Sequence, residues 1–221
     1  MSINRPYENI GEIADVIPVF PLPGVLLLPR GQLPLNIFEP RYVAMIDDAL
    51  KSHRLVGMIQ PATMATGPVP ALQPVGCTGR LTQIAETGDG RYLLTLSGIA
   101  RFRVVRELSS TTLYRQCQVD YSEFEADLGE AQGGTDVDRA GVIEALKKFA
   151  KARNLQVDWK EIDRAHNEML VNALSMISPF GSAEKQALLE ARDLKARAEV
   201  LVAITEMELA RAGGAGSSTL Q

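Results

Sequence analysis

The side chains most able to take part in catalysis or metal binding in this sequence are two histidines, two cysteines and one serine–lysine pair. His53 and His166 could act as general bases, but neither has a Cys, Asp or Glu at the spacing that a metal site needs. Ser182 and Lys185 could in principle form a nucleophile with a lysine base. We expect Ser182 to cap a helix instead, and Lys185 and both histidines to be surface residues. The sequence therefore predicts no catalytic residue, no metal site and no cofactor.

Motifs for nucleotide hydrolysis and acyl transfer are also missing. No Gly-Lys pair is followed by Ser or Thr, as the phosphate-binding loop of an ATPase requires. No serine lies in the G-x-S-x-G turn that exposes a hydrolase nucleophile. The sequence is thus expected to encode a protein that is not an enzyme.

The composition is that of an ordinary globular protein. Of the 221 residues, 46% are hydrophobic and 23% are charged, and the formal net charge of −4 gives no general attraction to nucleic acid. No apolar run approaches the roughly 20 residues of a membrane span, and none near the N-terminus suits a secretory signal. Cys77 and Cys117 fall in expected strands and should be free, buried thiols. These features predict a cytoplasmic protein with no membrane partner.

A charged pair beside two aromatic residues is the first candidate binding feature. Glu39 and Arg41 lie between Phe38 and Tyr42, where they could form a polar anchor beside an exposed aromatic ring. Alternatively, Glu39 accepts helix N–H bonds while Arg41 ties the start of a helix to the sheet. We favour the structural role for the charged pair, and retain all four residues as candidate peptide-binding residues.

A second candidate feature is apolar. Met169 and Met176, with Phe180 beyond them, could line an adaptable peptide groove, although such residues are more often core. A protein that recognises polypeptides needs an apolar surface, and the seam between two lobes is a common place for one. Met176 and Phe180 therefore join the candidate peptide-binding site.

A third candidate is a basic strip for RNA. Arg80, Arg101, Arg103 and Arg106 could share one face of a sheet, as RNA binding would require. That face lacks aromatic residues of the same parity, so a solvated sheet face is the simpler interpretation.

In the first half of the chain, the candidate residues lie in or next to expected strands. The pattern is strand-rich from Ile17 to about Tyr121, interrupted by a helix from Pro40 to about Ser52 that has Pro at its first position. Leu55–Gln60 reads as a buried strand and Pro61–Pro74 as a long loop. Gly88-Asp89-Gly90, between two strand patterns, predicts a hairpin turn.

Helices are predicted in the second half. Residues 123–134 are acidic, end in two glycines and are typical of a solvated linker. The pairs Thr135 with Asp138 and Asp158 with Glu161 resemble capping boxes at the starts of two helices. A further apolar stripe runs from Ala187 to about Ala212.

Several segments resemble the substrate-binding domain of Lon-type ATP-dependent proteases. Residues 17–42 contain Pro-Val-Phe-Pro-Leu and then Leu-Pro-Leu-Asn-Ile-Phe-Glu-Pro-Arg-Tyr, which resemble the family's opening. Residues 75–81 and 90–103 are similar to its Val-Gly-Cys strand and its Arg-Phe-Arg hairpin. Asn36 stands where the family commonly has His. The resemblance covers nearly the whole chain, without the family's ATPase and protease modules.

This resemblance implies an α+β fold with a PUA-like β pseudo-barrel followed by a helical bundle. The expected parts are a lead-in at 1–16, a β-rich lobe at 17–122, the linker at 123–134, a helical lobe at 135–212 and a tail at 213–221. The implied function is non-catalytic binding of unfolded or apolar polypeptide segments, with a separate protease as one conceivable partner. Because PUA-like barrels also bind RNA, an RNA-binding module is the alternative.

Overall fold

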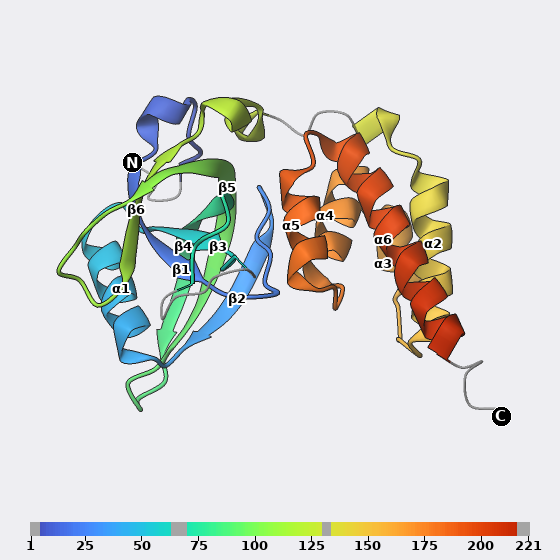
Figure 1. Ribbon diagram of the computed structural model, residues 1–221, viewed down its shortest axis with the longest axis horizontal. Coiled ribbons are helices and arrows are strands. Elements are labelled where there is room, and N and C mark those ends of the chain that lie inside the picture. The colour runs from blue at the N-terminus through green and yellow to red at the C-terminus, as the bar shows by residue number, and fades with distance from the viewer. Residues whose placement is uncertain (1–4, 63–69, 130–133, 216–221) are drawn as a thin grey trace. The chain divides into compact units, whose positions relative to one another are not determined.

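The computed structural model describes residues 5–62, 70–129 and 134–215, with side chains up to residue 211. The chain forms two compact units. The barrel unit combines residues 1–130 with 179–189, and the helical unit combines residues 131–178 with 190–221. Figure 1 shows strands in the first unit and helices in the second, which confirms the predicted α+β class.

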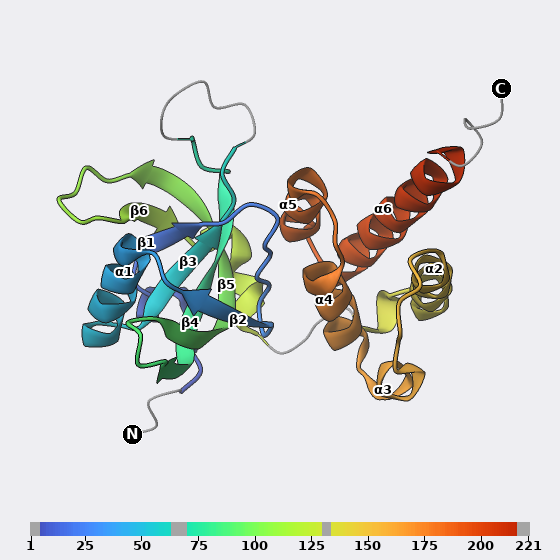
Figure 2. The same cartoon turned by 90° about the horizontal axis from the view of Figure 1, so that it is seen from below.

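Six strands build the barrel unit: β1 (Val16–Pro21), β2 (Gln32–Ile37), β3 (Leu55–Ile59), β4 (Val75–Glu86), β5 (Tyr92–Glu107) and β6 (Arg115–Asp120). The pairing order is β2-β5-β4-β3-β1-β6, and β5 also pairs with β6. Five strands therefore close into a ring, and β2 lies outside it as an extra strand (Figure 2). Among the strand pairs of the described residues, β1 and β3 are parallel and the others antiparallel. This arrangement agrees with the predicted pseudo-barrel.

The length of β5 explains how one strand has three neighbours. Its first half, from Tyr92 to Ser97, pairs with β2, and its second half, from Arg103 to Glu107, pairs with β6. The register against β4 shifts beside Gly79 and again after Leu81, which lets the long strand bend around the ring. The predicted hairpin turn joins β4 to β5, with Gly88 and Gly90 at φ of +77° and +81°.

Phe102 fills the centre of the barrel. Its side chain is fully buried among apolar residues that include Ile17, Leu55 and Cys117. A Cβ atom added at Gly76 would overlap the Phe102 ring, so the ring occupies the space that a larger residue would need. Cys77 and Cys117 are both buried, and neither forms a disulfide, as predicted.

Helix α1 (Pro40–Lys51) begins at the predicted proline and buries Tyr42, Met45, Ile46 and Ala49. Two tyrosines, one in β5 and one directly before β6, form hydrogen bonds to it. The hydroxyl of Tyr92 donates to Asp47 at 2.8 Å, and that of Tyr114 donates to Asp48 at 2.9 Å.

The predicted solvated linker is wrong over its first half. Residues Ser122–Leu128 form the 3-10 helix η2, in which Phe124 and Asp127 are buried. An aromatic ring and a paired carboxylate thus hold this segment on the barrel. Residues 130–133, the glycine-containing end of the predicted linker, lie outside the described residues. The lead-in likewise contains a short 3-10 helix, η1 (Ile10–Glu12).

The helical unit contains the 3-10 helix η3 (Gly134–Asp136), α2 (Arg139–Ala152), α3 (Trp159–Arg164), α4 (Asn167–Ile177) and α6 (Leu194–Ala215). Asp158 caps α3 as predicted, accepting from the N–H groups of Lys160 and Glu161. Asp138 caps α2 by accepting from Gly141 N–H at 3.0 Å. The assignment of Thr135 as that cap was wrong, because Thr135 lies in η3.

Two predicted helices are each divided in two. The helix expected to start at Asp158 ends at Arg164, and a new helix begins at Asn167. The apolar stripe expected from Ala187 onward is divided between α5 (Ser182–Glu190) and α6. Asp193 directly precedes α6, and its side chain accepts a hydrogen bond from the Ala196 N–H. The amide of Lys185 donates to the carbonyl of Gly181, so Gly181 occupies the cap position expected for Ser182. Residues 216–221 of the predicted tail lie outside the described residues.

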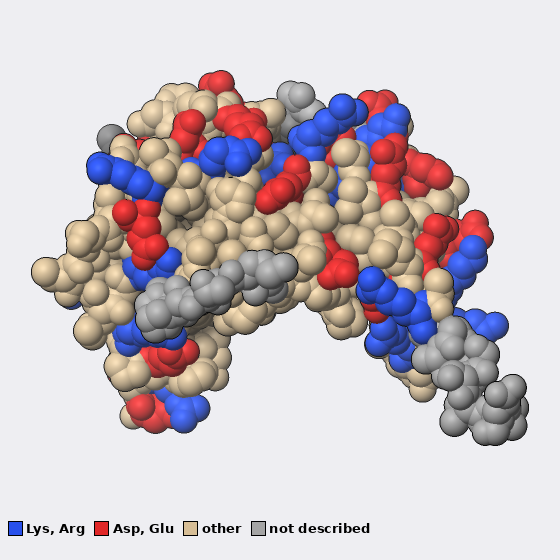
Figure 3. Space-filling model, viewed as in Figure 1, with Lys and Arg blue, Asp and Glu red and all other residues tan. Residues whose placement is uncertain are grey.

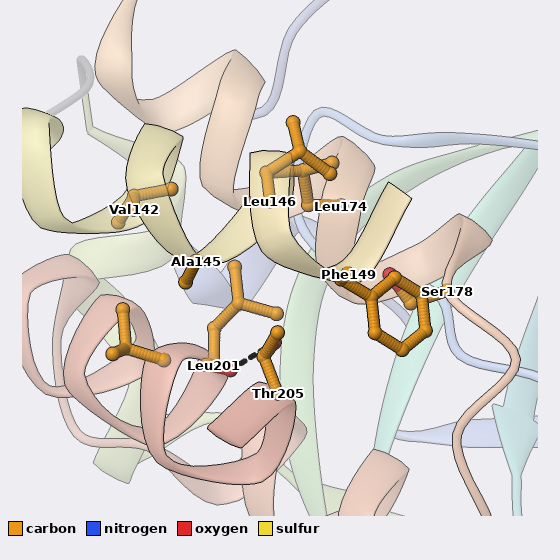
Figure 4. Close-up of a pocket in the computed structure, with 9 residues that line it drawn as sticks. Val142, Ala145, Leu146, Phe149, Leu174, Ser178, Leu201 and Thr205 are labelled. Atoms are coloured by element: carbon orange, nitrogen blue, oxygen red, sulfur yellow. Dashed lines mark hydrogen bonds between the residues drawn. The ribbon is translucent and has the colours of Figure 1, made fainter. Parts of the chain in front are cut away.

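Helices α2, α4 and α6 surround the core of the helical unit. A void of about 10 Å³ lies among them (Figure 4). Its lining is mostly apolar, including Ala145, Phe149 and Leu201, and it has at most the volume of one water molecule. The void is a packing defect rather than a ligand site. No helix in the described ranges is long and apolar enough to cross a membrane.

Candidate functional site

Phe38 is the exposed aromatic residue of the predicted site. It follows β2 directly and is 61% exposed. Tyr42, by contrast, is buried, and its ring centroid lies 4.2 Å from that of Phe20. Burial raises the pKa of Tyr42. Phe38 can therefore contact a ligand, whereas Tyr42 supports the start of α1.

Glu39 and Arg41 form an ion pair with each other at 2.8 Å. The Arg41 guanidinium lies 4.5 Å from the Tyr42 ring centroid. Glu39 occupies the N-cap of α1 but makes no side-chain cap hydrogen bond, so the predicted capping role is wrong. The pair remains available as a polar rim beside Phe38, since both side chains are about half exposed.

Met176 and Phe180 belong to different units. Met176 is half-buried on α4 of the helical unit, and Phe180 belongs to the barrel unit. Phe180 is buried, and the Lys185 ammonium lies 5.9 Å from its ring centroid. The geometry therefore favours a packing role for Phe180. The placement of a binding site between the two lobes stays a prediction.

A concave sheet face that the sequence analysis did not identify lies on the outside of β2, β5 and β4. Two cross-strand rows form it: Pro34–Thr95–Gln83 and Asn36–Leu93–Ala85. The hollow over these rows has a volume of about 530 Å³, within the usual range for ligand sites. Its signal in the sequence is the Tyr-Leu-Leu run at 92–94, because consecutive apolar residues in a strand point to opposite faces.

This face combines apolar and neutral polar groups. Pro34, Ala85 and Leu93 supply apolar contact, and Leu93 is 50% exposed. Asn36 and Gln83 supply amide groups, and the Thr95 hydroxyl donates to the side-chain Oε1 of Gln83 at 3.2 Å. Primary amides can both donate to and accept from a peptide backbone. Because none of the six side chains is charged, the face suits an uncharged polypeptide segment.

Phe38 follows the last residue of β2, one of the strands that form this face. It does not line the hollow itself. Pro34 lacks an N–H group, which weakens the outer edge of β2 as a place for another strand to pair. A ligand is therefore expected on the face rather than at the edge.

The expected surface lysine is buried. Lys185 on α5 is only 2% exposed, and burial lowers the pKa of its ammonium group to about 8. The neighbouring Ser182 offers its backbone carbonyl to the Gln60 side chain at 2.9 Å. The helical pattern did not predict the burial of Lys185, because α5 has polar residues on several sides.

The expected solvated arginine face is also wrong in part. Arg101 is buried and makes a two-point contact with Asp127, with distances of 2.8 Å and 2.9 Å. Arg103 pairs with Glu123 at the surface, and the Arg80 guanidinium lies over the Tyr7 ring. Figure 3 shows acidic and basic side chains interspersed on the visible face. Carboxylates thus pair with two of the four arginines, Arg101 and Arg103, which reduces the positive charge that RNA binding would need.

Reactive groups are scarce in the described parts of the chain. No group of three or more His, Cys, Asp or Glu residues there could hold a metal ion. Burial raises the pKa of the Cys117 thiol to about 11, which keeps it unreactive at neutral pH. His53 and His166 are exposed, as predicted.

Comparison with known proteins identifies the family. The model of the ATP-dependent protease La (LON) substrate-binding domain matches residues 16–206. The chain belongs to this family. Solved structures of Lon N-terminal domains share the fold: one from Xanthomonas campestris has a TM-score of 0.56 at 23% identity, covering 85% of this chain and 97% of that one. The N-terminal domain of Mycobacterium avium complex Lon protease has a TM-score of 0.62 at 18% identity, covering 86% and 98%.

The curated relatives are much longer than the chain. Lon protease 2 of Myxococcus xanthus is 29% identical over 205 residues, which are 88% of this chain and 24% of that protein. Lon protease 2 of Sorangium cellulosum is 30% identical over 208 residues, or 89% and 25%. The chain thus spans about a quarter of the length of the Lon proteases it matches.

Proposed function

We propose that this Lon substrate-binding domain recognises polypeptides through the concave sheet face and Phe38, without catalysing a reaction. The carrying observation is an uncharged hollow of about 530 Å³ over β2, β5 and β4, together with an aromatic side chain directly after β2 that is 61% exposed. Exposed aromatic residues beside apolar hollows are typical anchors in protein interfaces. The family supplies the class of ligand, and the geometry suits apolar, uncharged segments of unfolded proteins.

Two finer proposals follow from the same surface. A module of this kind in the cytoplasm would serve protein quality control, either as an adaptor that presents clients to a separate protease or by holding them itself. The purified chain should neither hydrolyse ATP nor degrade casein. Turnover that elutes together with the chain in size-exclusion chromatography would contradict the non-catalytic proposal.

The test is peptide binding by matched variants. A fluorescein-labelled peptide of Leu, Phe, Ser and Gly, without charges, is titrated with the protein and followed by fluorescence anisotropy. Phe38→Ala combined with Leu93→Ala should weaken binding by roughly tenfold or more, because interface anchors commonly contribute over 1 kcal/mol each. Both side chains are largely exposed, so thermal unfolding should change little.

The control is Leu113→Ala combined with Val105→Ala. These residues are 71% and 59% exposed and lie outside the concave face. Equal weakening by both pairs, or none by the Phe38 and Leu93 pair, would reject this face as the site. If nuclease-treated protein binds a single-stranded RNA probe and the peptide does not bind, the RNA alternative is correct instead.

A further inference from the structure

A second hollow lies in the helical unit, on the surface where α2 and α6 pack together. It has a volume of about 280 Å³, and its floor includes Val142, Ala198, Val202 and Ala203. Val142 and Ala198 are buried, and Val202 is half-buried. The floor is thus apolar and made of small side chains, which leaves room for a chain segment to lie against the helices. We call this hollow the helical groove.

Carboxylates dominate the rim of the helical groove. Asp136, Asp138, Glu199 and Glu206 line it with a single cation, Lys195. All five are exposed. On α6, Glu199 and Glu206 are two turns apart and therefore share one side of the helix. The groove carries an excess of negative charge over an apolar floor.

The four carboxylates have no ion-pair partner among the described residues. Other acidic residues of this unit do: Glu208 pairs with Arg153, and Glu161 lies near Arg164. Lys148 is within electrostatic range of Glu206, but its ammonium group lies 2.8 Å from Glu144. Lys195 acts electrostatically on Asp193, which lies outside the groove. The charge of the rim is therefore not neutralised by the described residues.

We propose that the helical groove binds a basic polypeptide segment, in which Arg or Lys side chains lie over the apolar floor. Such side chains match both features of the groove. Their aliphatic stems can pack on Val and Ala side chains while the charged heads reach the carboxylates at the rim. An apolar segment would leave the carboxylates unmatched, and an anion such as RNA would be repelled. This site is separate from the concave sheet face and does not depend on it.

The probe is a fluorescein-labelled peptide of alternating alanine and arginine, compared with the same peptide carrying neutral citrulline in place of arginine. We expect the arginine peptide to bind and the citrulline peptide to fail. Glu199→Gln combined with Glu206→Gln should weaken binding by roughly tenfold, because two charge pairs are lost while both helix positions keep a good helix former. Binding should also weaken as sodium chloride is raised, because the rim is exposed and screened.

The matched control is Glu161→Gln combined with Asp163→Asn. It removes the same two charges from α3, which does not line the groove. Equal loss in both double variants would show attraction to the net charge only and would overturn the proposal, as would unchanged binding in the groove variant. The Phe38→Ala and Leu93→Ala pair should bind the arginine peptide normally. If that pair also loses the peptide, the concave sheet face is the only site and the helical groove is rejected.

Discussion

At the scale of single residues, Arg101 and Asp127 form a buried ion pair in the barrel unit. Besides the two-point contact, Asp127 accepts from the Arg101 backbone N–H at 3.0 Å, and the Arg101 guanidinium donates to the carbonyl of Leu189 at 3.1 Å. The guanidinium also lies 4.6 Å from the Phe124 ring centroid. One arginine thus joins β5, η2 and α5.

Removal of one partner should be costly. Asp127→Ala leaves a buried guanidinium without its carboxylate, and we expect the free energy of unfolding to fall by roughly 3–5 kcal/mol. The measurement is urea unfolding followed by circular dichroism. Glu123→Ala is the control, because it breaks the exposed pair with Arg103 and should cost about 0–1 kcal/mol. Similar losses in the two variants would mean that the buried pair has no special role.

Lys185 gives a prediction about pH. Its pKa is about 8 in the folded protein and 10.5 for an unperturbed lysine. Between these values the unfolded chain binds more protons than the folded protein, so the stability of the protein rises with pH. The wild type should therefore gain stability relative to Lys185→Met from pH 8 to pH 10.5, by about 3 kcal/mol at most. Comparing the two proteins at each pH removes the effect of other titrating groups, and a flat difference would contradict the prediction.

Local sequence patterns predict the burial of some of these side chains but not of others. The burial of Cys117 follows from strand alternation, which is local and was predicted correctly. Cys77 lies in a stretch of β4 in which successive residues are all buried. The burial of Arg101 depends on a carboxylate that is 26 positions away in the chain, and no local pattern encodes that partner. Phe124 was a signal that could have been used, since an aromatic residue is out of place in a solvated linker.

At the scale of elements, caps decide where the helices of the second unit begin. Asp138→Ala should reduce the stability of the helical unit by about 1 kcal/mol, whereas Asp138→Ser should retain most of it. Thr135→Ala should have little effect, since Asp138 is the residue that accepts from Gly141. Thermal unfolding of the three variants tests this assignment. A larger loss for Thr135→Ala than for Asp138→Ala would restore the cap expected from the sequence.

The candidate binding surfaces illustrate what strand and helix patterns leave open. The strands that form the concave sheet face were expected, and Phe38, a candidate from the sequence, is exposed; its role in binding stays a prediction. The face itself depends on the register of β2 and β4 against β5, which is set by pairing between distant segments. The helical groove likewise depends on which sides of α2 and α6 meet. Periodicity shows that each helix has an apolar side but not the partner that covers it.

At the scale of the whole molecule, α5 belongs to the barrel unit although it follows three helices of the other unit. Gln60 on the barrel donates to the Ser182 carbonyl at 2.9 Å and to the Gln186 side chain at 3.1 Å. Gln186 in turn donates to the carbonyl of Val75. The sequence analysis assigned α5 to the helical lobe because helix propensity does not reveal the unit against which a helix packs.

The barrel unit should therefore require α5 for stability. A chain ending at residue 130 should unfold at a lower temperature than a variant in which residues 179–189 are joined to residue 130 by a flexible Gly/Ser linker. Both lack the helical unit, so the comparison isolates α5. Differential scanning calorimetry provides the measurement, and equal unfolding temperatures would show that α5 contributes nothing to the barrel.

The division of the barrel unit between two chain segments has a consequence for synthesis. All six strands emerge from the ribosome before α5 does. The hydrogen bonds of Gln60 to the Ser182 carbonyl and of Arg101 to the Leu189 carbonyl can form only once α5 has emerged. Helices α2, α3 and α4 are translated in between. The barrel is thus held incomplete during translation, and newly made chains would expose unfinished polar contacts to chaperones until α5 reaches it.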